Sequence, residues 1–89
     1  MYQVKLTPRA QRELDKLSGE DLERIITALH QLENNPRPSG VKKLRGFIHR
    51  IRVRDWRVIY AVLDKENLVL VGKIARRSKD TYDRISELF

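Results

Sequence analysis

Three consecutive stretches of alternating apolar and polar residues constrain the fold of this chain more than any other feature. They cover residues 47–53, 56–63 and 68–75 and are rich in β-branched and aromatic side chains. Such alternation is typical of strands with one buried face, and the segments between them are short enough for hairpin turns. We therefore expect a three-stranded antiparallel meander with turns at residues 54–55 and 64–67.

The residues before the meander predict one short strand and two helices. Apolar and polar residues alternate over 2–7, which indicates a strand. Thr7 and Pro8 form a typical helix start, and a helix is expected over about 8–17. Ser18, with Asp21 three positions later, resembles a capping box that begins a second helix. This second helix should end at the Pro- and Gly-containing loop at 34–40.

The last segment, residues 78–89, has a serine cap, an acidic first turn and helically spaced apolar residues, so it predicts a short closing helix. The complete order is then β-α-α-β-β-β-α. This order predicts an α+β fold in which an antiparallel sheet packs against a helical hairpin.

Length and composition limit the number of domains, the kinds of site and the kinds of partner that this chain can have. A chain of 89 residues has room for a single domain, expected to span residues 1–89. Without cysteine, and with only two histidines, it offers no disulfide and no evident metal site. No signal peptide or membrane span is apparent, so we expect a cytoplasmic protein that does not contact the membrane. Nineteen Lys and Arg against twelve Asp and Glu leave a net charge of +7, which indicates a polyanionic partner.

Hairpin geometry predicts that several arginines of the meander lie on one face of the sheet. A two-residue turn at 54–55 places Arg52 opposite Arg57. A four-residue loop at 64–67 places Arg57 opposite Ile74 and Ile59 opposite Gly72. Alternate residues share a face of a sheet, so one face is expected to carry Arg50, Arg52, Arg57, Gly72, Ile74 and Arg76. This expectation requires both loops to be even in length, because an odd loop would send Arg76 to the other face.

Like charges directly opposite each other weaken a sheet by up to about 1 kcal/mol. Arginines converging from several strands are suited to bidentate phosphate contacts and to stabilising the charge of a phosphoryl transition state. The cluster is therefore a candidate site for a phosphodiester. A simple solvated basic face of a nucleic-acid-binding protein remains the alternative interpretation.

Several short motifs together resemble the RelE/ParE superfamily of type II toxin–antitoxin toxins, in particular its RelE branch. They are K-L-R-G at 43–46, R-I-R-V at 50–53, W-R-V-I-Y at 56–60, and Arg76 followed six residues later by Tyr82. The resemblance covers essentially the whole chain and implies a RelE-like fold. It implies a metal- and cofactor-independent endoribonuclease that cuts mRNA in the ribosomal A site and inhibits translation. The 2′-hydroxyl would attack the adjacent phosphorus and leave a 2′,3′-cyclic phosphate.

The same resemblance implies roles for individual residues. The catalytic set would be Arg50, Arg52, Arg57, Arg76 and Tyr82. Apart from the resemblance, the basic residues Lys42, Lys43, Arg45, Arg54 and Arg77 are expected to contact RNA and the ribosome, although the first three could equally form a solvated strip. The best-known RelE pattern has lysines where this chain has Arg50 and Arg52, and a guanidinium does not give up a proton in a protein. Either the proton then goes to Tyr82 or to a group on the ribosome or RNA, or catalysis is weaker than in the type member of the family.

The resemblance also implies partners: mRNA on the ribosome, and a cognate antitoxin that neutralises the toxin and forms a co-repressor complex with it on operator DNA. Two alternatives stay open from sequence. One is a ParE-like DNA gyrase poison, which shares the fold. The other is a non-enzymatic basic module that binds nucleic acid through charge alone.

Overall fold

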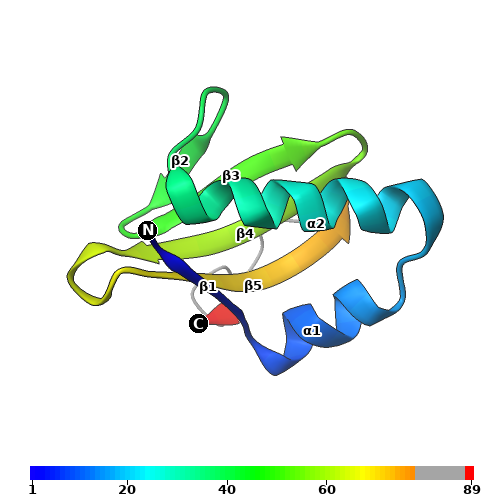
Figure 1. Cartoon of the computed structure of the whole chain (residues 1–89), viewed down its shortest axis with the longest axis horizontal. Coiled ribbons are helices and arrows are strands. Elements are labelled where there is room, and N and C mark those ends of the chain that lie inside the picture. The colour runs from blue at the N-terminus through cyan, green and yellow to red at the C-terminus, as the bar shows by residue number, and fades with distance from the viewer. Residues whose placement is uncertain (78–87) are drawn as a thin grey trace.

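A computed structural model of the protein describes residues 1–77 and 88–89 (Figure 1). The strands belong to one mixed sheet with the spatial order β1-β5-β4-β3-β2. β1 runs parallel to β5, and the other neighbours are antiparallel. The elements in chain order are β1 (Gln3–Leu6), α1 (Pro8–Asp15), α2 (Gly19–Asn34), β2 (Lys42–Arg45), β3 (Ile48–Val53), β4 (Trp56–Leu63), a 3-10 turn (Asp64–Glu66) and β5 (Leu68–Arg76).

The α+β class, the helical hairpin and the meander of β3, β4 and β5 are confirmed. Two features differ from the expectation. Lys42–Arg45 is an additional edge strand, which the sequence conceals because only one of its residues is apolar and charged side chains are common at sheet edges. In addition, β1 joins the sheet in parallel rather than antiparallel. The closing helix predicted over 78–89 lies outside the described residues apart from Leu88 and Phe89.

The two helices cover the same face of the sheet (Figure 1). α1 begins as predicted, with the Thr7 hydroxyl accepting a hydrogen bond from the Ala10 amide at 3.2 Å. Ser18 precedes α2, but its side chain makes no capping hydrogen bond, so the predicted capping box is wrong. The helices contribute to a core that contains Ala10, Ile25, Leu29, Leu32, Ile51, Val58, Tyr60, Val62, Val69, Val71 and Ile74.

The register between β3 and β4 follows the prediction. Arg52 lies opposite Arg57 and Val53 opposite Trp56, and the turn between them places Arg54 at a φ of 59°. Positive φ is what the common two-residue hairpin turns require.

Between β4 and β5 the expected register holds only for the half nearest the loop, where Tyr60 lies opposite Val71. The next pair is Ile59 with Lys73, so Gly72 is an extra residue in a β-bulge. The predicted pairs of Arg57 with Ile74 and of Ile59 with Gly72 are therefore wrong.

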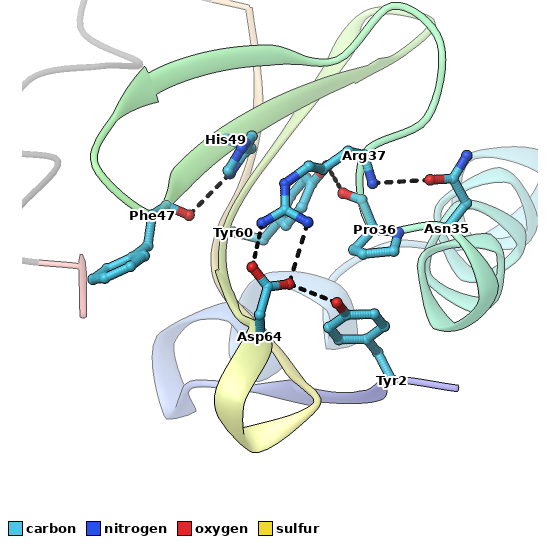
Figure 2. Close-up of polar contacts among 8 residues, drawn as sticks. All are labelled: Tyr2, Asn35, Pro36, Arg37, Phe47, His49, Tyr60 and Asp64. Atoms are coloured by element: carbon cyan, nitrogen blue, oxygen red, sulfur yellow. Dashed lines mark hydrogen bonds and ion pairs between the residues drawn. The ribbon is translucent and has the colours of Figure 1, made fainter.

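A polar cluster joins the loop after α2, the turn at Asp64–Glu66 and the N-terminus at one end of the sheet (Figure 2). The Arg37 guanidinium donates two hydrogen bonds to the Asp64 carboxylate, at 3.2 and 2.8 Å. The Tyr2 hydroxyl donates to the same carboxylate at 2.5 Å. These bonds lower the pKa of Asp64, and the Arg37 contact contributes most to the shift.

Two aromatic side chains of the sheet lie beside this cluster (Figure 2). The Tyr60 hydroxyl donates to the Pro36 carbonyl at 2.7 Å, and burial raises the pKa of Tyr60. The His49 ring stacks on Tyr60 with centroids 5.9 Å apart, and its Nδ1 lies 2.9 Å from the Phe47 carbonyl oxygen. Burial lowers the pKa of His49. His49 is thus a packed and hydrogen-bonded residue rather than a member of the arginine cluster.

None of the helices in the described part of the chain has the length and apolar character needed to cross a membrane.

The Asp64 cluster makes stability depend on pH in a defined direction. Because the pKa of Asp64 is lower in the folded than in the unfolded chain, its ion pair stabilises the fold above the unfolded pKa of about 3.9. This contribution is lost as pH falls through the folded pKa. Asp64→Asn should therefore be less stable than wild type at pH 7, and the difference should shrink below pH of about 4. Urea unfolding across this pH range measures it.

Glu23→Gln, on the exposed surface of α2, removes one carboxylate without touching the cluster and serves as the matched control. If the free energies of unfolding of wild type and Asp64→Asn differed by the same amount at every pH, the assigned role of the Asp64 charge would be contradicted.

Candidate nucleic-acid interface

We call the face of the sheet opposite α1 and α2 the arginine face, defined by Arg50, Arg52 and Arg57. Ile51 and Val58 lie opposite each other and pack into the helix-covered core. Side chains alternate along each strand, so the residues on either side of Ile51 and the residue before Val58 point to the other face. The three predicted arginines of β3 and β4 are therefore brought together.

Arg52 and Arg57 lie directly opposite each other on β3 and β4. Arg52 is exposed, whereas Arg57 is only 4% exposed, and the Arg57 Nη1 donates to the Trp56 carbonyl at 3.2 Å. Within residues 1–77 and 88–89, neither side chain forms an ion pair with a carboxylate. Their mutual repulsion costs up to about 1 kcal/mol, which a bound phosphate would offset.

Other basic residues extend the arginine face toward the β2 edge. Lys42 lies opposite Arg50, and Arg45 lies opposite Ile48, two positions from Arg50 along the same face. Both are exposed. Lys43 is also exposed, but it lies opposite His49 and so belongs to the helix-covered side. The two neighbouring lysines of β2 thus point to different faces.

Arg54 and Arg77 lie at the end of the sheet where β3 turns into β4. Arg54 occupies the turn itself, and the Arg77 amide donates to the Asp55 carbonyl of the same turn at 2.9 Å. Both residues are exposed. They place two further cations close to the Arg52–Arg57 pair.

A groove of about 420 Å³ runs between α2, the loop at 38–40 and β3. Arg50 and Arg52 line it from the strand, and Gln31 lines it from the helix.

Arg76 does not join the arginine face as expected. The bulge at Gly72 shifts the pairing by one residue, so Arg76 lies opposite Trp56 instead of continuing the row of Arg57. Its guanidinium carbon lies 4.9 Å from the centre of the Trp56 ring, and its Nη2 lies 3.8 Å from Asp21 of α2. The one-residue bulge thus sends Arg76 to the other face of the sheet, as a loop of odd length would have done.

A residue of α1 contacts β5 just beyond the bulge. The pairing of β1 with β5 ends at Val71, and the Ile74 amide donates to the Glu13 carboxylate at 2.9 Å. A buried amide without a partner would be costly. Glu13 thus supplies a hydrogen bond at the point where the strand changes register.

Glycine at position 72 also allows the end of the chain to approach β5. A Cβ at this position would lie 2.7 Å from the Phe89 ring and 3.1 Å from the Leu88 Cβ. These contacts are shorter than van der Waals contact, so only a residue without a side chain fits unless Phe89 moves.

Lys73 is the basic residue that reasoning from sequence missed. The changed register places it opposite Ile59, which in turn lies opposite Arg50 on the arginine face. The signal was present, because a glycine inside a strand pattern often marks a bulge. A bulge at Gly72 would have predicted both the gain of Lys73 and the departure of Arg76.

The arrangement of described residues provides positive charge and hydrogen-bond donors for a phosphodiester. Arg50 and Arg57 are buried, and a buried charge acts more strongly on a bound anion than an exposed one. Tyr82, the remaining member of the predicted catalytic set, lies outside the described residues. In the described ranges, no three His, Asp or Glu side chains come together in a way that could hold a metal ion.

Residues 4–81 match the family model described as the ParE toxin of the type II toxin–antitoxin system parDE. A Methanocaldococcus jannaschii protein provisionally named toxin RelE1 is 28% identical over 81 residues, which are 85% of this chain and 90% of that protein.

Two solved structures are similar over nearly their full length. The RelE chain of the archaeal RelE–RelB complex from Pyrococcus horikoshii has a TM-score of 0.80 and 29% identity, covering 88% of this chain and 97% of that chain. The isolated E. coli RelE toxin has a TM-score of 0.76 and 25% identity, with both chains covered completely.

The bond between Glu13 and the bulge can be tested by substitution. Glu13→Ala leaves the Ile74 amide without its acceptor and should lower the free energy of unfolding by about 1–3 kcal/mol. Glu13→Gln retains a side-chain oxygen and should lose less. Urea unfolding at neutral pH measures both.

Glu13 also lies 3.8 Å from Arg9, so Arg9→Ala controls for loss of that ion pair. If Arg9→Ala were as destabilised as Glu13→Ala, the loss would belong to the ion pair and the assigned role of the bulge contact would fail.

Proposed function

Because the chain belongs to the ParE toxin family of type II toxin–antitoxin systems and is a RelE-like toxin, we propose that it is a ribosome-dependent mRNA endoribonuclease. It would cut mRNA in the ribosomal A site and so inhibit translation. The observation that carries this proposal is the direct opposition of Arg52 and Arg57, which has no structural benefit without a bound anion.

The proposed reaction is attack of the RNA 2′-hydroxyl on the adjacent phosphorus, which yields a 2′,3′-cyclic phosphate and a free 5′-hydroxyl. Arg57, buried in the sheet, would bind the non-bridging phosphate oxygens and stabilise their growing charge. Arg50 and Arg52 would bind the same phosphate or its neighbour from β3. No metal or cofactor takes part in this scheme.

Arg76 and Tyr82 remain proposed members of the catalytic set. For Arg76 the proposal requires its guanidinium to leave Trp56 and Asp21 when RNA binds, because both contacts hold it toward the helix-covered side. The 3.8 Å separation from Asp21 at an exposed position is a weak restraint.

The remaining basic residues would bind RNA without acting on the scissile bond. Lys42, Arg45, Arg54 and Arg77 surround the arginine face, and Lys43 lies just beyond its edge. They are exposed, so they would contact phosphates of mRNA or ribosomal RNA mainly through charge.

A cognate antitoxin is the proposed protein partner. The P. horikoshii RelE and an E. coli RelE similar to this chain were both solved in complexes with their antitoxins. The net charge of +7 favours an antitoxin segment that carries acidic residues and folds on the toxin surface. The complex would also act as a co-repressor on operator DNA, and both proteins would work in the cytoplasm.

A ParE-like gyrase poison is the second candidate, because the matched family model is itself that of a ParE toxin. In this case the arginine face would bind without cutting RNA, and cells would accumulate DNA breaks.

Primer extension on a defined mRNA in translating ribosomes tests the two candidates. Wild-type protein should produce breaks within A-site codons. Arg57→Ala should reduce cleavage by about 10²- to 10³-fold, the usual loss when a preorganised electrostatic contact to the transition state is removed. Arg12→Ala, which removes one exposed charge from α1, should cleave like wild type.

Equal cleavage by wild type and Arg57→Ala would remove the arginine face from the reaction. Absence of ribosome-dependent breaks, together with DNA breaks in cells that produce the wild-type protein, would favour the gyrase poison.

A further inference from the structure

The proposed reaction needs a proton donor for the departing 5′-oxygen, and the arginine face supplies few side chains able to serve. A guanidinium stays protonated in proteins, so Arg50, Arg52 and Arg57 can stabilise charge but cannot transfer a proton. A lysine ammonium can do both. The question is which lysine of the sheet lies near the phosphate site.

The bulge changes which residues of β5 face the phosphate site. Gly72 is the extra residue between the Tyr60–Val71 and Ile59–Lys73 pairs, and beyond it the alternation of side chains is reversed. Ile74 therefore remains in the helix-covered core, while Lys73 moves to the opposite side. The partners form one continuous row across four strands of the arginine face, namely Lys42, Arg50, Ile59 and Lys73.

Lys73 lies close to the buried arginine of β4. Arg57 is opposite Ala75, two positions from Lys73 along the same face, so Arg57 and Lys73 are diagonal neighbours about 7–8 Å apart at their Cα atoms. Ala75 is too small to separate their side chains. Lys42, the other lysine of the row, lies at the exposed β2 edge beyond Arg50, three strands from Lys73.

We propose that Lys73 is a catalytic residue whose ammonium group protonates the 5′-oxygen during RNA cleavage. The lone pair of the 2′-oxygen forms the new bond to phosphorus, and its proton passes to solvent water. The P–O5′ bond breaks, its electron pair goes to the 5′-oxygen, and this oxygen takes a proton from Lys73. The amine then regains a proton from solvent. This inference rests on the proposed endoribonuclease function.

If Lys73 donates a proton, a positive charge alone at position 73 should not be enough for cleavage. Lys73→Arg keeps the positive charge but removes the transferable proton. The measurement uses ribosomes that carry a defined mRNA and are saturated with protein. The single-turnover cleavage rate of Lys73→Arg should be at least about 10²-fold lower than that of wild type. Lys65→Arg, in the exposed turn before β5, is the matched control and should cleave like wild type.

A substrate with sulfur in place of the scissile 5′-oxygen separates this role from a structural one. A thiolate leaves without protonation, so Lys73→Arg should cleave the sulfur-containing mRNA at a rate close to that of wild type. Arg57→Ala should remain slow on the same substrate, because it acts on the non-bridging oxygens. Rescue of one variant but not the other is the expected result.

The outcomes distinguish failure of this inference from failure of the proposed function. If Lys73→Arg cleaves ordinary mRNA like wild type, or is equally slow on both substrates, Lys73 is not the proton donor, while cleavage by wild type still supports the endoribonuclease. If wild type cleaves neither mRNA, the endoribonuclease proposal is overturned, and this inference with it. Lys73→Gln, which lacks both charge and proton, should be at least as slow as Lys73→Arg on ordinary mRNA and faster on the sulfur substrate.

Discussion

The β-bulge at Gly72 is the feature on which the rest of the interface depends. It shifts the β4–β5 register by one residue, and just beyond it the Ile74 amide donates to Glu13 of α1. The bulge allows one strand to satisfy two demands: Val71 and Ile74, three residues apart, both enter the core. In a regular strand, residues three apart point to opposite faces. The cationic composition of the arginine face follows from this single irregularity.

The burial of Arg57 gives the face its second property. An arginine in the middle of a sheet, with its neighbours Val58 and Ile59 fully buried, has little conformational freedom. The entropy of placing its guanidinium is therefore lost when the protein folds rather than when a ligand binds. Exposed residues such as Arg52 remain free to adjust to a ligand. The face thus combines two buried cations, Arg50 and Arg57, with exposed ones such as Arg52, an arrangement suited to holding one phosphate precisely and its neighbours loosely.

Much of this architecture could be predicted from the sequence because its signals are local. The two-residue turn at 54–55 determines the pairing of Arg52 with Arg57, and the helical hairpin follows from the Thr7 cap and the spacing of apolar residues. The edge strand at Lys42–Arg45 could not, because its pairing with β3 is favoured by position rather than by apolar pattern. Gly72 inside the strand pattern was a local sign of a bulge, but the even-loop register assumed a regular strand, so the placement of Arg76 and Lys73 was missed. The contact of Glu13 with Ile74, 61 positions apart in the chain, follows from no local rule.

The parallel pairing of β1 with β5 has a consequence for the time course of folding. Tyr2 and Asp64, which meet beside this pairing, are 62 positions apart, and β5 pairs with β4 on its other edge. Contacts between distant parts of a chain form slowly, because loop closure must precede any gain from the contact. The hairpin of β3 and β4, which brings Arg52 to Arg57, joins neighbouring residues and can form early. A newly made chain therefore presents two of its arginines before the strand carrying Lys73 is anchored on both sides.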